Sequence, residues 1–403
     1  MKNNLLYFDI CIVGGSIAGN YLCYLLSDLN LKIVVIEEHA EIGRPFQCAG
    51  IVSQKLSKLI DLPEEIVLNR VNTAKIVSPS GKYIELSGTE KPFVIDRVAF
   101  DKLFYNKTKD HKNISYLLGE KFKGFNYIVE QSKKSLLIKT SKREIKCKIL
   151  IGCDGPLSLV AKSVGIKSKI IYGAQIRITA NFNKEEAVLF FDPRWKELIG
   201  WIVPEGNNNI YRIGVASAKN IGENLKVLLN KLNIDKNKKI DQQGGIIPYG
   251  FMNKLAFDNV LLLGDAACQV KATTGGGIVM LLIAAKYAAY CIVKCFNVNK
   301  FSKKFIKKNY EKPCCAIVGK ELKLHYALRK IFENLSSEDF ENLFQIVRKN
   351  QNIEKLISLY GDMDFPKSLI VHLLKNLIMI KFIIRLIVKK PVLFLKLVGS
   401  LIF

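Results

Sequence analysis

Continuous apolar runs recur through the first 290 residues of the chain. They lie at residues 9–13 and 32–38, within 148–162, and at the start of 259–290. An apolar run without alternation is typical of a strand that is buried on both faces of a parallel sheet. A glycine-containing turn and a helix through about Asp28 separate the first two runs, so the pattern predicts a βαβ unit.

A different pattern marks residues 74–86 and several stretches between 171 and 217, where apolar and polar residues alternate. Alternation with period 2 predicts antiparallel strands with one buried face. Asp96 stands just before an amphipathic run and is a candidate helix N-cap. After Tyr290 the chain becomes basic and polar, and its helical periodicity includes a capping box from Ser336 to Asp339.

The tail, residues 369–403, combines long aliphatic stretches with basic side chains and no acidic residue. The basic residues are Lys375, Lys381, Arg385, Lys389, Lys390 and Lys396. A membrane-spanning helix needs about 20 apolar residues, and here charges recur too often. We expect a basic amphipathic helix lying in the membrane interface. The alternative is a helix that packs back on its own domain with a solvated lysine face.

Composition adds a strong positive charge to this picture. The chain has 403 residues, 49% of them hydrophobic, and a formal charge of +25, which calls for an anionic partner. No aromatic-basic recognition motif is present, so we expect a membrane surface and no nucleic acid. The ten cysteines form no C-x-x-C pair, which favours reduced thiols in a cytosol. We therefore expect a cytoplasmic protein that associates peripherally with the membrane. No ligand spacing predicts a metal site, and the short N-terminal apolar run predicts a buried strand and not a signal peptide.

The glycine turn after the first apolar run has nucleotide-binding chemistry. In "ICIVGGSIAGNYL", Gly14 permits a tight turn, and Gly19 permits close packing of the following helix on the sheet. The helix N-terminus offers free N–H groups to a pyrophosphate. Glu37 ends the second apolar run, where a carboxylate can accept hydrogen bonds from a ribose. Ser16 replaces the middle glycine of the usual G-x-G-x-x-G pattern, and its side chain would crowd a phosphate.

Two later motifs narrow the choice of nucleotide that the chain could bind. "KILIGCDGPLSLVAK" is an apolar run ending in Asp154, with Ser158 at a helix start. "NVLLLGDAACQVKATTGGGIVMLLIAAKYAAY" places Asp265 after an apolar run and a triple glycine before a long helix. The carboxylate of the aspartate can accept a hydrogen bond from a hydroxyl group. The glycines leave room for a flat ring, and their N–H groups would stabilise negative charge on it. A plain glycine-rich turn would not explain the aspartate.

With these three motifs the chain resembles flavoproteins of the p-hydroxybenzoate hydroxylase-like class, and within it the geranylgeranyl reductase family. The resemblance spans roughly residues 9–289 and implies FAD as cofactor. It also implies an α/β fold with a Rossmann-like, three-layer ββα FAD-binding domain formed by residues 1–73, 97–170 and 245–295. An antiparallel substrate domain would comprise residues 74–96 and 171–244 and roof the flavin. Residues 296–403 would form a helical C-terminal region.

The resemblance also implies individual site residues. The segment "EIGRPFQCAGIVS" would cross the flavin, with contacts from Cys48, Ala49 and Ile51 and with Arg44 pairing the pyrophosphate. Cys48 is the candidate catalytic residue because a thiol beside a flavin can donate a proton; alternatively it is a small buried hydrophobe. The remaining cofactor contacts implied are Arg97, the backbone of Phe122 at the adenine, Asp265, Gly276, Gly277 and Ile278.

Trp201 is the candidate substrate residue. It lies in "GWIVP", which resembles the family's aromatic-then-proline strand, although Ile199 and Gly200 replace a tyrosine of the family pattern. The indole could line a lipid tunnel or fill a core.

The function implied is an FAD-dependent reductase that hydrogenates carbon–carbon double bonds of geranylgeranyl chains in isoprenoid lipids of the archaeal ether type. An aromatic hydroxylase or monooxygenase of the same fold is the alternative, and a basic membrane- or nucleic-acid-binding protein with a structural flavin is a third. The basic, aliphatic tail favours the reductase over the hydroxylase. Only one nucleotide fingerprint is present, so the electron donor is expected to be external: a reduced ferredoxin, a deazaflavin or a nicotinamide.

Overall fold

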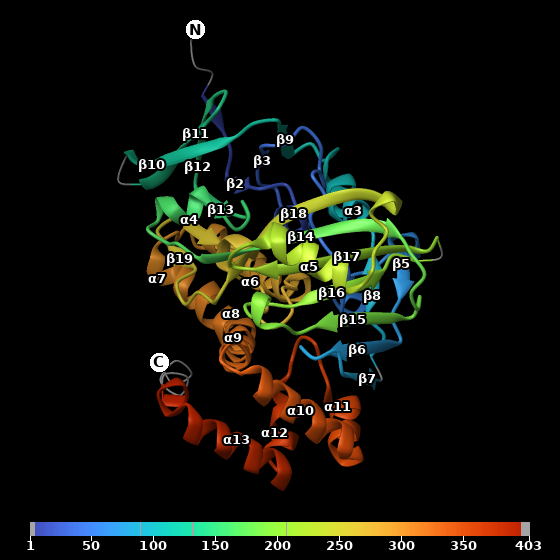
Figure 1. The fold of residues 1–403 in the computed structure, drawn as a ribbon. Coiled ribbons are helices and arrows are strands. Elements are labelled where there is room, and N and C mark those ends of the chain that lie inside the picture. The colour runs from blue at the N-terminus through green and yellow to red at the C-terminus, as the bar shows by residue number, and fades with distance from the viewer. Residues whose placement is uncertain (1–4, 89, 131–132, 207, 396–403) are drawn as a thin grey trace.

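The computed structural model describes residues 5–395 except 89, 131–132 and 207, so Lys396 lies outside the described residues. The apolar runs form a sheet in the order β19-β20-β13-β2-β3-β9 (Figure 1). All neighbours are parallel except the edge pair β19–β20. The strands are β2 (Ile10–Val13), β3 (Ile33–Glu37), β9 (Ile114–Leu118), β13 (Ile149–Gly152), β19 (Ala256–Phe257) and β20 (Val260–Leu262). The βαβ prediction is confirmed.

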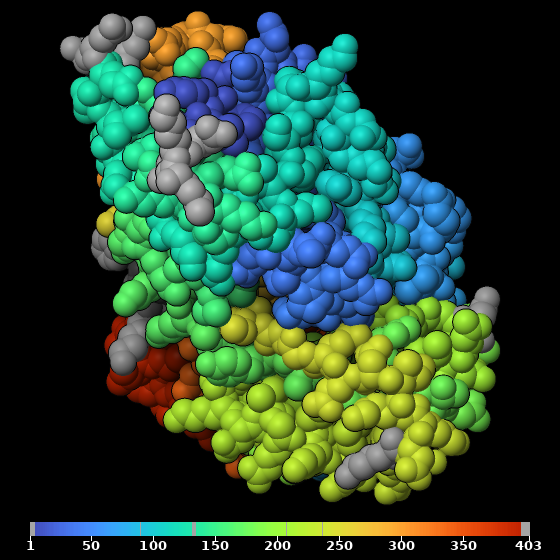
Figure 2. All heavy atoms as spheres, turned by 90° about the horizontal axis from the view of Figure 1, so that it is seen from above, coloured from blue at the N-terminus to red at the C-terminus, as the bar shows by residue number. Residues whose placement is uncertain are grey.

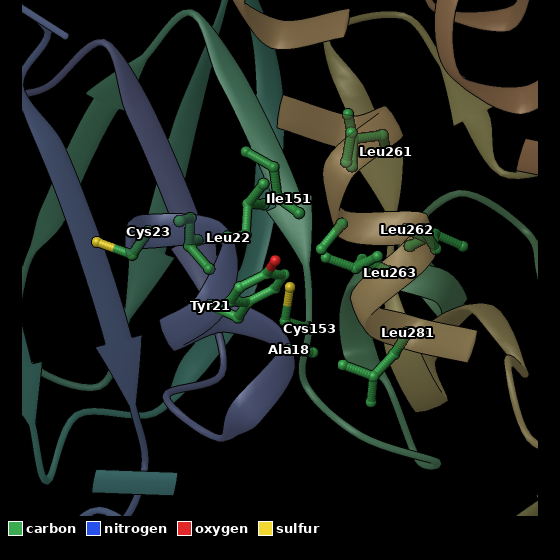
Figure 3. Close-up of a cluster of buried hydrophobic side chains, with 14 of the residues drawn as sticks. Ala18, Tyr21, Leu22, Cys23, Ile151, Cys153, Leu261, Leu262, Leu263 and Leu281 are labelled. Carbon is green, nitrogen blue, oxygen red and sulfur yellow. The ribbon is translucent and has the colours of Figure 1, made fainter. Parts of the chain in front are cut away.

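Helices α1 (Ile17–Leu26) and α6 (Ile278–Asn297) pack together against this sheet. Figure 3 shows side chains from α1, β13, β20 and α6 pointing toward one another in this core. By length and composition α6 could cross a membrane, but 67% of its apolar window is buried inside the chain. We therefore interpret α6 as a core helix. Nearby lie α2 (Leu56–Leu59), α3 (Arg97–Thr108), α4 (Leu159–Ser163) and the 3-10 turns η1 (Glu64–Ile66) and η4 (Gly264–Ala267).

A second sheet, in the order β1-β12-β11-β10, contacts β13 through β11 and completes the ββα layering expected of the FAD domain. Its strands are β1 (Leu6–Tyr7), β10 (Phe122–Glu130), β11 (Lys133–Thr140) and β12 (Glu144–Cys147). The helix predicted after Asp96 is α3, and the Asp96 side chain accepts hydrogen bonds from the backbone of Val98 and Ala99.

The alternating stretches form a seven-stranded sheet in the order β18-β14-β17-β16-β15-β6-β7, which we call the roof sheet. It contains β6 (Thr73–Val77), β7 (Tyr83–Ser87), β14 (Lys169–Thr179), β15 (Glu186–Phe190), β16 (Gly200–Pro204), β17 (Ile210–Ser217) and β18 (Lys239–Tyr249), with α5 (Ile221–Lys231), η2 (Pro193–Trp195) and η3 (Lys236–Lys238) in its connections. The expectation of antiparallel strands is wrong for one pair, because β6 and β15 run parallel. Antiparallel hairpins join neighbours in sequence, whereas here much of the FAD domain is inserted between the two strands.

Two features cross the domain limits expected above. β8 (Phe93–Ile95) pairs with β4 (Ile51–Val52) and β5 (Val67–Arg70) in a separate three-stranded sheet and not with the roof sheet. β18 carries the roof sheet to Tyr249, beyond residue 244. In Figure 2 the blue to cyan surface of the N-terminal third adjoins the green to yellow surface of the later roof-sheet segments, β14 to β18. The domain limits themselves stay a prediction.

The rest of the chain is helical. It comprises α7 (Lys303–Ile306), the π-helical turns η5 (Lys307–Glu311) and η6 (Cys315–Gly319), α8 (Lys312–Cys314), α9 (Lys320–Glu333), α10 (Ser337–Lys349), α11 (Gln351–Tyr360), α12 (Lys367–Leu373) and α13 (Leu377–Lys389). The predicted capping box is present at the start of α10. The tail is not one helix: Asn376 caps α13 after a break from α12, and α13 packs against α10.

Candidate active site

The first glycine turn joins β2 to α1, and its shape depends on two missing side chains. Gly14 has φ +106°, and a Cβ there would lie 2.2 Å from the carbonyl oxygen of Cys153. A Cβ on Gly19 would lie 1.9 Å from the carbonyl oxygen of Gly14. Glu37, at the end of β3, accepts a hydrogen bond of 2.7 Å from the backbone N–H of Gly15. The turn and the acidic residue expected at the ribose are therefore in contact.

The serine in the middle slot is turned toward α3. Its Oγ donates to Asp101 Oδ2 at 3.2 Å. Asn20, on the first turn of α1, donates through Nδ2 to the carbonyl oxygens of Gly15 and Asp101 and leaves its own Oδ1 buried without a partner. Sequence reasoning missed both Asn20 and Asp101. The run "DRVAFD" held the signal, because Asp101 stands one helical turn after Arg97.

Arg97 brings the first glycine turn, Cys48 and Asp265 together. Its guanidinium donates to Asp101 Oδ1 at 3.2 Å, and it lies within interaction range of the Cys48 thiol and of Asp265. Burial opposes its charge, yet Asp101 and Cys48 together raise the pKa of Arg97. Its Nε is buried with no partner among the described residues. An unpaired buried donor of this kind indicates a missing acceptor.

Asp265 follows β20 in the turn η4, as expected from the sequence. Burial raises the pKa of its carboxyl to about 6, and the positive charge of Arg97 opposes that rise. In the described part of the chain this carboxylate accepts no hydrogen bond. It is therefore a free acceptor beside a free donor, which suits the hydroxyl and phosphate groups of a flavin nucleotide.

The segment that carries Cys48 is clamped to the roof sheet. Gln175 on β14 donates to the carbonyl oxygen of Cys48 at 3.0 Å and accepts from Trp201 Nε1 at 3.1 Å. The Arg212 guanidinium, 1% exposed, donates to the carbonyl oxygen of Ala49 at 2.7 Å and pairs with Glu205. The candidate substrate residue and the candidate catalytic residue are thus linked through one glutamine. Sequence reasoning did not find Gln175 or Arg212, because nothing local distinguishes them from other strand residues.

The second glycine loop runs from η4 to the start of α6 and is fixed by the C-terminal region. Lys271 Nζ lies 2.5 Å from Asp364 Oδ1, and both residues are buried, at 4% and 0% exposure. The Arg329 guanidinium donates to the carbonyl oxygens of Ala272, Leu198 and Thr273. Burial lowers the pKa of Arg329 to about 10, so it stays charged at neutral pH.

His325 adds a third anchor to this loop. Its Nε2 lies 3.0 Å from the carbonyl oxygen of Asp364, and its Nδ1 lies 2.6 Å from Thr273 Oγ1. Because a carbonyl can only accept, Nε2 carries the proton and Thr273 donates to Nδ1. Burial lowers the pKa of His325 to about 4. None of these anchors was predicted, since each pairs loop residues with partners more than 50 positions away.

The remaining predicted residues are placed as follows. Arg44 is exposed, Ile51 lies in β4, and Phe122 is buried at the start of β10. The backbone N–H of Glu120, two residues before Phe122, donates to the carbonyl oxygen of Glu37, so β10 begins beside the predicted ribose residue. Gly276 and Gly277 precede Ile278, the first residue of α6. Within the described residues no cluster of three His, Cys, Asp or Glu side chains could hold a metal.

These observations test whether the site fits a flavin nucleotide. Gly14 follows β2 and Asp265 follows β20, so both lie at carboxyl ends of strands in the parallel sheet, where such folds bind dinucleotides. Arg97, whose Nε has no partner among the described residues, reaches the first turn through Asp101 and Ser16 and interacts with Asp265. The fold and site thus define an α/β flavoprotein with a roof sheet over its nucleotide-binding domain.

Comparison with known proteins gives the family. Residues 7–219, more than half of the chain, match the model of the FAD binding domain. The chain belongs to this FAD-binding family, and it is an FAD-dependent oxidoreductase.

The chain is also similar to individual proteins. Uncharacterized protein MJ1520 of Methanocaldococcus jannaschii is 28% identical over 92% of this chain and 95% of its own length. Digeranylgeranylglycerophospholipid reductase 1 of Methanococcoides burtonii is 27% identical over 83% of this chain and 86% of its own length. The crystal structure of a geranylgeranyl bacteriochlorophyll reductase-like protein from Thermoplasma acidophilum has a TM-score of 0.81 at 20% identity, covering 97% of this chain and all of that one. At this identity the structural likeness shows the fold alone.

Proposed function

We propose that the chain hydrogenates carbon–carbon double bonds of geranylgeranyl chains carried by an isoprenoid lipid. The observation that carries the proposal is the position of Cys48. Its thiol is near Arg97 on the cofactor side, while the adjoining Ala49 and Ile51 pack with Trp201 in an apolar cluster under the roof sheet. A proton donor between a group of charged side chains and an apolar cluster suits the reduction of an apolar chain. The name of the relative from M. burtonii supports the same chemistry.

The residues divide the work of the reaction as follows. The first glycine turn, Arg97 and Asp265 would hold FAD, which in its reduced form would supply the hydride for one alkene carbon. The Cys48 thiol gives its proton to the other carbon, and the thiolate is reprotonated from water. Arg97 balances the charge of the thiolate in the interval. Gln175 holds the Cys48 backbone and the Trp201 indole in fixed relation, so that an alkene packed on the indole faces the thiol. The electrons for the next turnover would come from an external donor.

The test is single turnover with lipid. Dithionite-reduced protein is mixed with a detergent-dispersed geranylgeranyl lipid, and mass spectrometry measures the gain of one H₂ per reduced bond. Cys48→Ala should keep FAD and lower the turnover rate by about 100-fold or more, the range of a lost general acid. Cys315→Ala is the matched control, since Cys315 is also a partly exposed free thiol, but on η6.

Two results would contradict the proposal. One is reduction at an unchanged rate by Cys48→Ala, which would remove the thiol from the reaction. The other is the absence of lipid reduction together with oxygen-dependent hydroxylation of an aromatic substrate, which would favour the monooxygenase alternative.

A further inference from the structure

Helix α13 is apolar on two opposite faces. Met379, Phe382 and Leu386 point inward and join the hydrophobic cluster that α10 supplies with Phe340 and Phe344. The outer stripe of α13, defined by Leu377, Ile384 and Val388, is 74%, 54% and 75% exposed. A surface helix of a globular protein normally has polar residues on its outer face. Packing within the chain therefore does not explain why the outer stripe is apolar.

The outer stripe does not stand alone. Other exposed apolar side chains precede it on α12 and in the turn after it, and follow it beyond Lys390: Val371, Leu374, Val392 and Leu395. Figure 1 shows α12 and α13 at the edge of the molecule, away from the parallel sheet. A concentration of exposed apolar side chains in one region of the chain is typical of a membrane or protein interaction site.

A basic groove lies beside the outer stripe. It occupies about 480 Å³ between α10 and α13, and its charged lining residues are Lys349, Lys381 and Arg385, with no acidic residue in the lining. Three carboxamides also line it: Asn342, Gln345 and Asn350. Lys349 and Lys381 form no ion pair within the described residues, and Arg385 pairs only with the exposed Glu338. Lys381 is four residues after Leu377 and three before Ile384, so it borders both the groove and the outer stripe.

We propose that α12 and α13 dock on an anionic phospholipid membrane, with the outer stripe in the acyl boundary and a lipid phosphate in the basic groove. The occupant follows from complementarity: the apolar stripe fits acyl chains, and the unpaired lysines with neighbouring amide donors fit a phosphate diester. The net charge of +25 favours the same surface. This inference goes beyond the proposed reaction, because it concerns binding and holds whether or not the chain reduces isoprenoid lipids.

The outer stripe is tested with full-length holoprotein and vesicles, either phosphatidylcholine alone or an equal mixture with phosphatidylglycerol. The protein should sediment with the mixed vesicles. Ile384→Ser combined with Val388→Ser should weaken this binding by about tenfold or more, because apolar insertion is lost. Val129→Ser combined with Val298→Ser is the control, since these residues are 68% and 50% exposed on β10 and at the end of α6. FAD absorbance verifies that each variant is folded.

The basic groove has its own pair of variants. Lys349→Gln with Lys381→Gln should weaken binding to the mixed vesicles about tenfold and reduce its salt dependence. Lys226→Gln with Lys304→Gln makes the same change of charge at exposed positions on α5 and α7 and should have less than a twofold effect. Equal losses in the two pairs would mean that net charge alone attracts the membrane, and the groove would be overturned as a headgroup site.

A direct measurement does not depend on these losses. In Val388→Trp, the indole fluorescence gained over that of the parent protein, which has two tryptophans, should be quenched by vesicles whose acyl chains carry bromine, because the outer stripe would place the new side chain in the acyl boundary. Absence of quenching in vesicle-bound protein would overturn the insertion. A second result would also overturn it: the protein does not bind vesicles, and it forms a dimer that Ile384→Ser with Val388→Ser dissociates. The outer stripe would then face a second copy of the chain.

Discussion

The two glycine-rich turns of the cofactor site reach their shapes by different means. The first, Gly14 to Gly19, is fixed by backbone contacts: each glycine lies against a carbonyl oxygen that a Cβ would strike. The second, from Gly264 to Gly277, is fixed by charged side chains whose partners lie in the C-terminal region, above all Lys271 with Asp364. One turn is thus fixed by close backbone contacts and the other by long-range electrostatics. The two turns should therefore fail in different ways.

The difference has energetic consequences. A side chain forced onto a backbone atom cannot be relieved without moving the sheet, because both atoms belong to the packed core. A buried ion pair behaves differently. Removing one of its two charges is costly, because the other is left buried and unpaired, whereas replacing both by apolar side chains costs little, because the desolvation of the two charges offsets much of their attraction. The second turn also depends on every element between Lys271 and Asp364 being folded.

The largest effect is expected at the first turn. Gly19→Val places a branched side chain where a Cβ alone would approach the Gly14 oxygen to 1.9 Å. We expect a loss of about 5 kcal/mol or more in the free energy of unfolding, the range of severe core clashes, with loss of bound FAD. Denaturant unfolding and flavin absorbance measure both. Gly222→Val is the control, because open space surrounds that glycine and a change within about 0.5 kcal/mol is expected. Near-equal losses would refute the steric account.

The second turn should show the signature of a buried ion pair. Lys271→Met leaves Asp364 charged and unpaired, so the free energy of unfolding should fall by about 3–5 kcal/mol. Adding Asp364→Leu should recover most of that loss, because neither charge then remains buried. The surface pair Lys102–Glu41 is the control, and Lys102→Met should lower the free energy of unfolding far less, because solvent screens an exposed ion pair. A double variant no more stable than Lys271→Met would show that the loop needs the charges themselves.

His325 makes the second turn sensitive to acid. Burial lowers the pKa of His325 to about 4 from a usual value of 6.5, so between these values the unfolded chain binds the proton and the folded chain does not. Its contribution to stability is full above about pH 6.5 and is lost as the pH falls toward 4, by up to about 3 kcal/mol.

His325→Gln has no group that titrates in this range. On acidification, the free energy of unfolding of wild type should therefore fall more steeply than that of His325→Gln. Urea titrations from pH 4 to pH 7 measure it, and parallel pH profiles for the two proteins would exclude His325 as the cause.

The smallest effect separates binding of the cofactor from support of the turn. Asp265→Ala should weaken FAD binding by about 1.5–3 kcal/mol, the value of a hydrogen bond to a charged group, with little loss of stability in the apoprotein. Trp201→Ala should leave FAD affinity nearly unchanged, because the indole bonds to Gln175 in the roof sheet. Titration of the apoproteins with FAD measures both. Equal loss of affinity in the two variants would mean that Asp265 does not contact the cofactor.

Prediction from sequence was most successful where one segment carries its own determinants. The βαβ unit, the Asp96 cap and the Ser336–Asp339 capping box are all confirmed. Glu37 was placed beside the first turn because only 23 residues separate it from Gly14, and the structure joins it to Gly15. The parallel pairing of β6 with β15 was not foreseen, since strand alternation specifies a buried face but not a neighbour.

The tail shows the same limit at the surface. Its basic and aliphatic pattern predicted an amphipathic helix, but not which face would be outermost. Packing on α10 took Met379, Phe382 and Leu386 inward and left the outer stripe exposed. The tertiary structure decided this because both faces of α13 are apolar, so the periodicity alone admits either orientation.

The sequence by itself determined the strands, the first glycine turn and the acidic residues at the strand ends, because steric and hydrogen-bonding requirements over a few residues leave few alternatives. Only the tertiary structure decided the partners of Lys271, Arg329 and His325, the clamp of Gln175 and Arg212 on the Cys48 segment, and the outward face of α13. Each of these depends on which distant groups the fold brings within about 3 Å, and a charge or amide can be satisfied by any suitable partner. Contacts between distant segments therefore made up most of what could not be read from the sequence, although Asp101, one helical turn after Arg97, was missed as well.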